Sequence, residues 1–446
     1  MKIFCKNNQF KRKKILVYGK GLTGSGAKKF LFAKGAKVFF FQDGEKLSFK
    51  PEKLDLAVLS PGISLETSLS KTLKELNVPI ISELQLGFEN VKGNLIAITG
   101  TNGKTTTSIL LTKILGANSF YVGNTDNPLI SLWNVSSENS NIVCETSSFQ
   151  LESSTTFRPK ISAILNLAPD HLLRHKTFEN YVNQKAKIFR NQTETDFAVF
   201  NYDDKNVVNL SKNCKAKIYN FSLNNQFENQ NYNGTYVSND EIYFKENFEN
   251  VFVMKTEKIK LVGSKNLENI LAAICIAKLC DVSSKQIEKV VSNFMPLKDR
   301  LEIVLKTQNI CYVNDSKATN VASVLADLQA LGGKTIALFG GSDKGENFVP
   351  LFEKLSKNVA FAVLFGATKE KLSCAANEVG FKNFEVASSL GKAIMKAKEI
   401  YREKFNNEKI NIVLSPACAS FDEFRNYEER GEYFKNYILN GEKYEK

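Results

Sequence analysis

The stretch Leu95-Ile-Ala-Ile-Thr-Gly-Thr-Asn-Gly-Lys-Thr-Thr106 decides the fold of the chain around it. Its apolar run, glycine turn and following helical segment predict a strand, a phosphate-binding loop and a helix. In such a loop the backbone N–H groups at the start of the helix bind phosphate oxygens, Lys104 neutralises phosphate charge, and the Thr105 hydroxyl is a ligand for Mg²⁺. The match covers only the G-x-x-G-K-T end of the usual pattern, because Ile98 stands where that pattern has its first glycine. A glycine turn that merely precedes a helix is the alternative.

The length and composition describe a packed globular protein of several domains. At about 150 residues per domain, 446 residues predict three domains. The hydrophobic share of 43% and the charged share of 24% exclude a disordered or fibrous chain. Lysine and arginine outnumber the acids by 60 to 47, but the lysines are spread along the chain and mixed with acids. We therefore expect no nucleic-acid partner.

The targeting, cysteine and histidine patterns predict a cytoplasmic protein. The N-terminus has no apolar signal region, and no stretch reaches the ~20 apolar residues of a membrane span. The eight cysteines include no CxxC pair, and several lie in apolar runs, so we expect them to be reduced. His171 and His175 are the only histidines, which excludes a His-rich zinc centre.

Apolar runs alternate with amphipathic stretches along most of the chain, which predicts an α/β fold with parallel sheets. The run Ile15-Leu-Val-Tyr18 leads into Gly19-x-Gly21-x-x-Gly24 and opens a Rossmann-like unit, with Asp43 near the distance expected of a ribose partner. This motif fits a dinucleotide, a UDP-sugar or a close-packed turn. The Asn-rich stretch at about 222–250 predicts antiparallel hairpins or surface excursions rather than a domain of its own. The predicted domains are an N-terminal Rossmann-like domain at 1–92, a central P-loop domain with a parallel sheet at 93–297, and a C-terminal Rossmann-like domain at 298–446.

Two strands of the central domain end in candidate metal ligands. Glu145 follows Asn141-Ile-Val-Cys144, and Asp170-His171 comes shortly after Ile161-Ser-Ala-Ile-Leu-Asn166. Open α/β sheets bind ligands at the carboxyl ends of their strands, so Glu145 and His171 are candidate ligands of a divalent ion beside the phosphate loop. For His171, a structural hydrogen bond is the alternative.

The C-terminal domain has three strand-end loops that carry Lys, Ser and Thr. They are Asn314-Asp-Ser-Lys-Ala-Thr-Asn320, Gly340-Gly-Ser-Asp-Lys344 and the segment from Leu414 to Tyr427. Together they predict a pocket for an anionic small molecule. Ordinary turn chemistry, with Ser and Thr as helix N-caps, is the alternative for each loop alone.

Taken together, these segments resemble the Mur ligases, and the resemblance covers nearly the whole chain. The last two segments are typical of the member of the family that adds D-glutamate. The segments that carry the resemblance, in chain order, are Gly19-Lys-Gly-Leu-Thr-Gly24, Thr99-Gly-Thr-Asn-Gly-Lys-Thr105, Glu145-Thr-Ser-Ser-Phe-Gln-Leu-Glu152, Asn166-Leu-Ala-Pro-Asp-His171, Gly263-Ser-Lys-Asn-Leu-Glu-Asn269, Asn314-Asp-Ser-Lys-Ala-Thr-Asn320 and Ser415-Pro-Ala-Cys-Ala-Ser-Phe-Asp422.

The resemblance implies a monomeric, ATP-dependent ligase of three domains. The first domain would bind UDP-N-acetylmuramoyl-L-alanine, the second ATP with Mg²⁺, and the third D-glutamate. The reaction would phosphorylate the substrate carboxylate and let the amine of D-glutamate attack the acyl phosphate. Because two anionic groups must approach each other, the site needs Mg²⁺ and lysines.

The resemblance also implies roles for individual residues. ATP would be bound by Gly100, Thr101, Asn102, Gly103, Lys104, Thr105, Thr106, Asn266, Arg300 and Asp315. The UDP-substrate would contact Leu22, Thr23 and Asn124, and D-glutamate would contact Thr319, Lys344, Ser420 and Tyr427. The metal would be held by Thr105, Glu145, His171 and a carbamylated Lys185, and the catalytic set would be Lys104, Glu145, His171, Lys185 and Lys317.

Some positions and alternatives stay open at this point. Lys187, two positions beyond Lys185, is the other candidate for carbamylation. The alternative for Lys185 itself is an unmodified lysine at the surface. The chain departs from the family pattern at Leu173, Lys265, Asp126 and Tyr427, which bears on the sugar and amino-acid contacts. The competing functions are another ligase of this family, a folylpolyglutamate synthase-like ligase, and a nucleotide-gated binding module.

Overall fold

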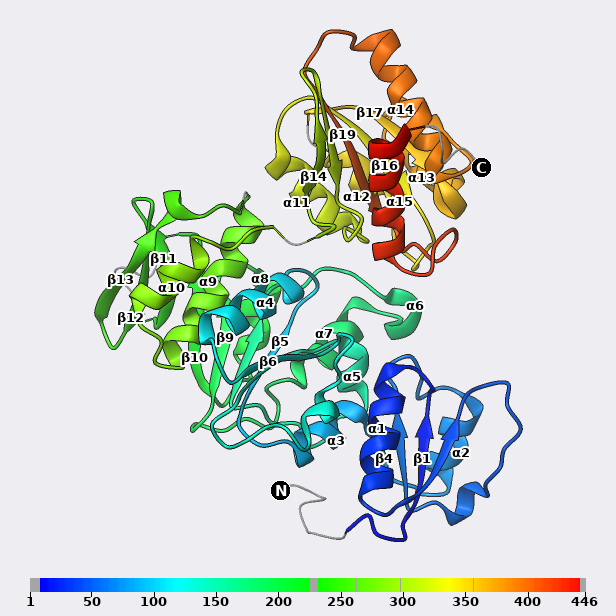
Figure 1. Cartoon of the computed structure of the whole chain (residues 1–446), viewed down its shortest axis with the longest axis vertical. Helices are drawn as coiled ribbons and strands as arrows, with labels where there is room; N and C mark the ends of the chain where they lie inside the picture. The colour runs from blue at the N-terminus through cyan, green and yellow to red at the C-terminus, as the bar shows by residue number, and fades with distance from the viewer. Residues whose placement is uncertain (1–8, 225–231, 262, 297, 356, 442–446) are drawn as a thin grey trace. The chain divides into compact units, whose positions relative to one another are not determined.

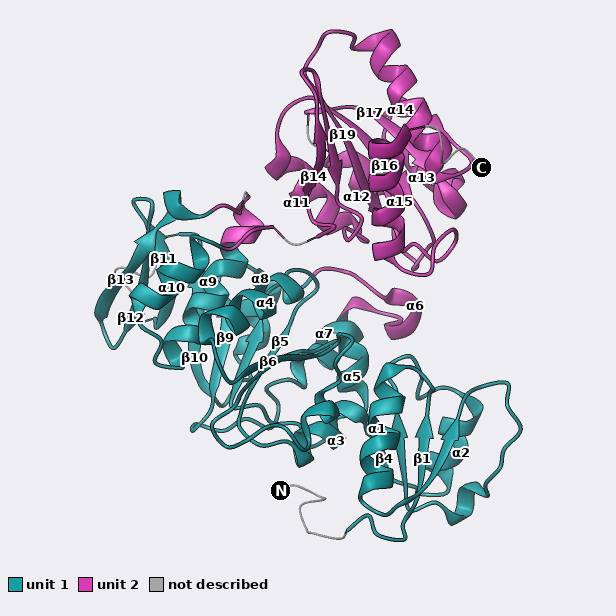
Figure 2. Cartoon of the chain, in the orientation of Figure 1, with its two compact units in different colours: residues 1–167, 179–259, 268–293 teal, residues 168–178, 260–267, 294–446 magenta. Residues whose placement is uncertain are grey.

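The computed structural model describes residues 9–224, 232–261, 263–296, 298–355 and 357–441. The chain divides into two compact units, which Figure 2 colours separately. The first holds residues 1–167, 179–259 and 268–293, and the second holds residues 168–178, 260–267 and 294–446. Cys5, Leu297 in the predicted linker and residues 225–231 of the Asn-rich stretch lie outside the described residues.

Three sheets run through the described part of the chain, and helices connect their strands (Figure 1). Parallel pairings dominate all three sheets, so the predicted α/β class is confirmed. Each sheet falls within one of the ranges 1–92, 93–297 and 298–446. The division into three domains at those boundaries stays a prediction.

The first sheet is four-stranded and parallel, in the order β2-β1-β3-β4. Apolar strand residues such as Leu16 and Val17 are fully buried against the helices on its two faces. Its elements are β1 (Lys14–Tyr18), α1 (Leu22–Ala33), β2 (Lys37–Phe41), η1 (Pro51–Lys53), β3 (Leu56–Leu59), α2 (Ser68–Glu75), β4 (Ile80–Ser82) and α3 (Glu83–Asn90).

The second sheet is nine-stranded, in the order β13-β12-β11-β10-β9-β8-β5-β7-β6. The strands from β5 to β11 pair in parallel, whereas β11, β12 and β13 pair antiparallel, which confirms the hairpins predicted for the Asn-rich region. Its strands are β5 (Asn94–Thr99), β6 (Ser119–Gly123), β7 (Asn141–Glu145), β8 (Ile161–Ile164), β9 (Phe197–Asn201), β10 (Lys217–Ser222), β11 (Gly234–Ser238), β12 (Glu241–Glu246) and β13 (Glu249–Lys255).

Helices between these strands carry several of the predicted site residues. They are α4 (Lys104–Leu115), η2 (Leu129–Leu132), α5 (Ser148–Glu152), α6 (Leu172–His175), α7 (Phe178–Ala186), α8 (Lys205–Ser211), η4 (Thr256–Lys258), α9 (Ser264–Leu279) and α10 (Ser284–Val291).

The third sheet is six-stranded, in the order β14-β15-β19-β16-β17-β18, and only the β14–β15 pair is antiparallel. Buried apolar clusters cover both of its faces. Its elements are β14 (Glu302–Lys306), β15 (Ile310–Asn314), α11 (Val321–Leu331), β16 (Thr335–Gly340), α12 (Val349–Glu353), β17 (Val359–Phe365), η5 (Gly366–Thr368), α13 (Lys369–Glu378), β18 (Phe384–Val386), α14 (Leu390–Lys404), β19 (Ile410–Ala417) and α15 (Tyr427–Asn440).

Helix α3 ties the first sheet to the second within the first unit. The Oε1 atom of Glu83 accepts a hydrogen bond from the Ile130 N–H of η2 at 2.7 Å, and Gln85 Oε1 accepts one from the Thr155 N–H at 2.6 Å. The second carboxylate oxygen of Glu83 is buried and has no hydrogen-bond partner among the described residues. This burial raises the pKa of Glu83 to about 7.

We predict that the Glu83 carboxyl makes the stability of this unit depend on pH. The folded chain keeps a proton on Glu83 that the unfolded chain releases near the ordinary pKa of 4.5. The free energy of unfolding therefore falls as the pH rises from about 4.5 through about 7, by about 3 kcal/mol in all. Urea unfolding of the parent and of Glu83→Gln across this range measures the effect. The glutamine keeps an acceptor for Ile130 and should flatten the slope; equal slopes in both proteins would contradict the prediction.

Candidate functional site

The phosphate loop predicted from the sequence lies at the carboxyl end of β5, which is flanked by β7 and β8. Helix α4 begins at Lys104, and its N-cap residue is Gly103, which has no side chain to cover the helix N-terminus. Gly103 adopts a φ of +85°, and a Cβ there would lie 2.0 Å from Asn269 Oδ1. Glycine is therefore required at this position.

Asn166 at the end of the neighbouring strand β8 clamps this loop. Its side chain accepts a hydrogen bond from the Asn102 N–H at 2.8 Å and donates one to the Asn102 carbonyl at 3.1 Å. Its main-chain carbonyl accepts a further bond from the Thr101 N–H at 2.9 Å. Asn166 lies in one of the segments that carry the family resemblance, but no role was predicted for it. Its position just after a predicted strand is the feature of the sequence from which a role in the site could have been predicted.

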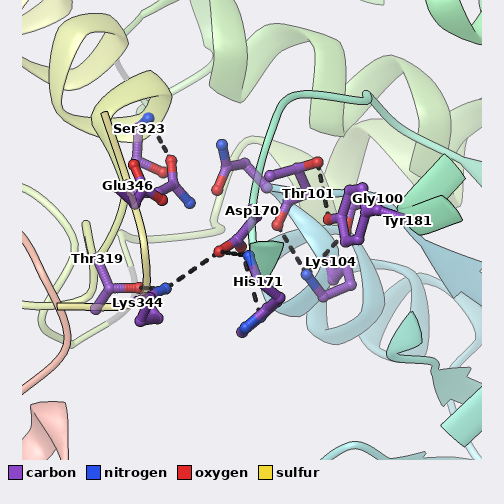
Figure 3. A network of polar contacts seen from close by, with 12 residues as sticks. Gly100, Thr101, Lys104, Asp170, His171, Tyr181, Thr319, Ser323, Lys344 and Glu346 are labelled. Carbon is purple, nitrogen blue, oxygen red and sulfur yellow. Dashed lines mark hydrogen bonds and ion pairs between the residues drawn. The ribbon is translucent and has the colours of Figure 1, made fainter. Parts of the chain in front are cut away.

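Two lysine amines converge on the carbonyl oxygen of Gly100. Lys104 Nζ donates to Gly100 O at 2.9 Å and to Thr101 O at 2.8 Å, and Figure 3 shows its side chain turned back toward the loop. Lys185 Nζ, from α7, donates to Gly100 O at 2.8 Å and to Thr99 Oγ1 at 3.3 Å. The amine of Lys185 also lies over the ring of Tyr181. Two lysine amines thus lie within hydrogen-bond reach of one backbone oxygen.

The structure distinguishes Lys185 from its rival Lys187. Lys185 is only 2% exposed and faces the phosphate loop. Lys187 lies beyond the end of α7 and donates to the Glu152 carbonyl at 2.6 Å instead. Burial, followed by the nearby charge of Arg190, lowers the pKa of Lys187. Lys185 therefore contacts the phosphate loop, whereas Lys187 contacts the residue that ends α5.

Glu145 ends β7 and is buried beside the loop after β6. Its Oε2 atom accepts a hydrogen bond from the Tyr121 hydroxyl at 2.8 Å, and its Oε1 atom accepts one from Asn124 Nδ2 at 3.2 Å. The Asn124 N–H also donates to the Glu145 carbonyl. The predicted metal ligand and a predicted contact of the UDP-substrate are therefore direct neighbours. Tyr121 was not anticipated from the sequence, because its role depends on the pairing of β6 with β7.

The Gly19-x-Gly21-x-x-Gly24 loop follows β1 at the carboxyl edge of the first sheet. Gly24 is buried, and a Cβ there would lie 1.8 Å from the Gly19 carbonyl oxygen, so the helix packs closely on the turn. Leu22, in contrast, is 61% exposed at the start of α1, and Thr23 beside it is half-buried. The structure places these two residues where a ligand at the strand ends could reach them.

In the second unit, Lys344 contacts Thr319, another predicted residue of the amino-acid pocket, and Asp170, for which no role was predicted. Its Nζ atom lies 3.3 Å from Asp170 Oδ1 and 3.5 Å from the Thr319 hydroxyl. Figure 3 shows the side chain directed toward both. Asp170 in turn accepts a hydrogen bond from the His171 N–H at 2.8 Å, and its second oxygen lies 3.6 Å from His171 Nε2. The hydrogen bond comes from the main chain of His171, so the role of its imidazole stays a prediction.

A half-buried carboxyl group, that of Glu346, lies beside this lysine. Glu346 accepts a hydrogen bond from the Val321 N–H, at the start of α11, at 3.3 Å. Its Oε1 atom is buried without a partner among the described residues. Burial, with the negative charge of Asp170 adding to it and Lys344 opposing it, raises the pKa of Glu346 to about 7. The sequence reading missed Glu346.

Asp315 and Arg300 belong to a second buried group in this unit. Ser415 donates a hydrogen bond to Asp315 at 2.7 Å, and Arg300 lies 3.3 Å from Asp327. Burial, and then the charge of Asp327, raises the pKa of Asp315 well above its usual range, while Arg300 opposes the shift. Asp327 was absent from the sequence prediction.

The remaining predicted residues of the amino-acid pocket gather at the carboxyl edge of the third sheet. Lys317 Nζ lies 5.0 Å from the centre of the Tyr427 ring, and Ser420 is buried just beyond β19. Arg430, which the sequence did not single out, binds Ser316 O, Cys418 O and Ala419 O and so holds two of the loops together. Burial lowers the pKa of Arg430 to about 10. Asn266 lies in the first turn of α9.

The predicted metal ligands divide between the units: Thr105, Glu145 and Lys185 belong to the first and His171 to the second. Among the described residues, no group of three or more His, Cys, Asp or Glu side chains lies together so that it could hold a metal ion. The cysteines within the described ranges are free thiols. No helix in the described part of the chain has both the length and the apolar character of a membrane span.

A parallel sheet whose inner strand leads into a glycine loop and a helix, with lysines at the loop, defines an α/β protein of the phosphate-binding class. Family comparison is more specific. Residues 98–277 match the Mur ligase middle domain, and residues 299–415 match the glutamate ligase domain of the Mur ligases.

Curated relatives are similar in sequence over most of the chain. The UDP-N-acetylmuramoylalanine--D-glutamate ligase of Caldanaerobacter subterraneus subsp. tengcongensis is 40% identical over 399 residues, which cover 88% of this chain and 86% of the relative. The protein of the same name from Caldicellulosiruptor bescii is 38% identical over 455 residues and covers 96% of this chain and 98% of its own. The chain belongs to the Mur ligase family and is a ligase.

Solved structures share the fold at lower identity. A pseudomurein peptide ligase type C from Methanothermus fervidus is 18% identical, with a TM-score of 0.60 over 91% of this chain and 97% of that one. The MurF ligase of Thermotoga maritima, solved in complex with ADP, is 16% identical, with a TM-score of 0.57 over 98% and 97% of the two chains.

We predict that Gly24→Ala destabilises the first unit by about 3 kcal/mol, because the new methyl group would overlap the Gly19 carbonyl. The matched control is Gly21→Ala, where a Cβ meets no atom within 4 Å. That change at the N-cap of α1 should cost less than about 1 kcal/mol. Urea unfolding followed by circular dichroism compares the two variants. Equal losses of stability would contradict the packing argument.

Proposed function

We propose that the chain joins D-glutamate to UDP-N-acetylmuramoyl-L-alanine at the expense of ATP, as a step of peptidoglycan precursor synthesis. The names of the relatives support this choice of substrates. The observation that carries it is the position of the Lys104 amine at Gly100 O, beside the N-terminus of α4, with Lys185 buried against the same loop. A polyanionic phosphate chain needs such a concentration of positive charge.

The three predicted domains divide the binding between them in this proposal. Residues 1–92 bind the UDP-substrate through Leu22 and Thr23, with Asn124 added from the next domain. Residues 93–297 bind ATP through the loop at 100–106. Residues 298–446 bind D-glutamate and, through Arg300 and Asp315, the nucleotide. The order of the three sheets along the chain agrees with this division.

The chemical problem is that a carboxylate is a poor electrophile and repels a phosphate. Bound ATP supplies the phosphoryl group that converts the carboxylate of the UDP-substrate into an acyl phosphate. The amine of D-glutamate then attacks the carbonyl carbon, the tetrahedral intermediate collapses, and phosphate leaves as the amide forms. Lys104 and the N–H groups of α4 lie where they can offset the charge that accumulates on the phosphoryl oxygens.

The oxygen donors near the loop fit Mg²⁺. The Glu145 carboxylate and the Thr105 hydroxyl are hard oxygen ligands, and Glu145 is buried at the end of β7. Carbamylation of Lys185, by addition of its neutral amine to CO₂ with loss of a proton, would supply another. When bound, the ion neutralises charge on the phosphate oxygens. His171 completes the proposed ligand set.

In this proposal D-glutamate binds to Lys344, whose ammonium group is already held in place by other side chains. Lys344 is oriented by Asp170 and Thr319, and it is largely shielded from solvent. A substrate carboxylate that approaches Lys344 thus finds an ammonium group whose position is set in advance, so that little ordering is needed on binding. Lys317 beside Tyr427 offers a second positive charge at the same edge of the sheet.

We predict that phosphate release from ATP requires UDP-N-acetylmuramoyl-L-alanine and D-glutamate together. Replacement of D-glutamate by L-glutamate should lower the rate by about a hundredfold or more, because the pocket groups cannot meet both carboxylates of the mirror-image acid. A coupled phosphate assay with a panel of amino acids measures this. Release that needs ATP alone would favour a nucleotide-gated binding module, and release with a different amino acid would favour another ligase of the family.

We predict that Lys185→Ala lowers the ligase rate by about 10²–10³-fold and that formate or acetate restores part of it, by replacing the carbamate oxygens. Lys187→Ala is the matched control, since this neighbour contacts Glu152 rather than the loop. It should keep most of the activity. Full activity in Lys185→Ala, or equal losses that no carboxylate rescues, would refute the role of Lys185.

A further inference from the structure

The positive charge of the chain is concentrated at one end of the sequence. The first 50 residues hold 13 lysines and arginines but only two acids, Asp43 and Glu45. The other 396 residues hold 47 basic and 45 acidic residues. The lysines are spread along the chain, as the sequence reading stated, but the acids are not. Nearly all of the net charge of +13 therefore belongs to the region of the first two strands.

The fold gathers many of these charges at the amino edge of the first sheet. The Arg12 N–H donates to the Gly35 carbonyl at 2.9 Å, and the Lys37 N–H donates to the Lys13 carbonyl at 2.8 Å. These bonds bring the segment before β1 against the segment before β2. We call the exposed side chains there the basic edge, defined as Lys11, Arg12, Lys13, Lys34 and Lys37.

The outer face of helix α1 extends the basic edge. Lys28, Lys29 and Phe32 share one face, because they are spaced three and four residues apart. All three are exposed, and Phe32 is 75% exposed. The Phe32 carbonyl accepts a hydrogen bond from the Gly35 N–H, so this face adjoins the basic edge. Within residues 9–92, Phe32 is the one exposed aromatic side chain.

The contacts of these lysines leave most of their charge uncompensated. Lys13 pairs with Asp55 at 2.8 Å. Lys28, Lys34 and Lys37 lie over aromatic rings, which keep the positive charge in place. Acidic partners are few here, since Glu52 and Asp55 are the nearest acids that precede the adjacent strand β3.

The proposed substrates do not account for this surface. Ligands of parallel sheets bind at the carboxyl ends of the strands, where the Gly19–Gly24 loop lies. The basic edge is at the opposite, amino ends of β1 and β2. A surface that is strongly positive, carries one exposed aromatic and faces away from the ligand edge has the composition of an interfacial membrane-binding face.

We propose that the basic edge and the outer face of α1 bind an anionic lipid bilayer surface, with Phe32 entering the headgroup region. Twelve of the 13 basic residues in the first 50 are lysines, which act as point charges toward a lipid surface. Nucleic-acid sites that bind bases add side chains that meet base edges, or several aromatic rings on which bases stack, whereas this surface has one exposed aromatic ring. The inference is independent of the ligase substrates, because it concerns another edge of the sheet.

The test is sedimentation of the full chain with phosphatidylcholine vesicles, with and without one quarter phosphatidylglycerol. Binding should need the anionic lipid and should weaken at least tenfold when salt rises from about 0.1 M to about 0.5 M, since screening shortens the electrostatic range. Replacing Lys11, Arg12, Lys28 and Lys29 together by glutamine should lower the partition coefficient by about a hundredfold or more. Phe32→Ala should lower it by roughly tenfold.

The matched control replaces Lys357, Lys382, Lys392 and Lys409 by glutamine. These four lysines are exposed in the second unit, and the change in net charge is the same. The control should bind anionic vesicles as the parent does, and both quadruple variants should keep the parent circular dichroism and ligase rate. Equal binding to neutral vesicles, equal losses in both quadruple variants, or binding to a single-stranded RNA oligonucleotide without binding to anionic vesicles would each overturn the proposal.

Discussion

The hydrogen bonds that hold the loop after β5 are the constraint on which the site depends. Asn166 binds the main chain of Thr101 and Asn102, and the Gly100 carbonyl accepts from both Lys104 and Lys185. Because the loop is held from β8 and α7, the N-terminus of α4 keeps one orientation. A charged ligand can then bind without reorganising the backbone, which is the basis of electrostatic preorganisation.

Buried ionisable groups accompany the site in both units. Glu83, Glu346 and Asp315 all have raised pKa values, and burial is the largest cause for each. Carboxyl groups in such places accept hydrogen bonds from fixed donors such as the Ile130 and Val321 N–H groups. The protein retains them where one structural element meets another, as at α3 and at the start of α11.

Local sequence patterns correctly predicted several strands and helices and the position of the phosphate loop. The run before Gly100 is β5, the segment from Lys104 is α4, and the Asn-rich region forms antiparallel strands where the structure describes it. The family assignment from seven short segments is confirmed by the comparisons. These features were accessible because strand and helix periodicity, and glycine turns, are properties of contiguous residues.

The roles of Asn166, Tyr121, Glu346 and Arg430 were not accessible in this way. Each depends on which strands are neighbours: Asn166 reaches the loop because β8 lies beside β5, and Tyr121 reaches Glu145 because β6 pairs with β7. The sequence by itself determined the α/β class, the phosphate loop and the family. Only the tertiary structure decided that Lys185 rather than Lys187 faces the loop, and that the basic residues before β1 and β2 share one edge. The physical reason is that periodicity sets the conformation of a segment, whereas charge and hydrogen-bond partners are set by residues far away in the chain.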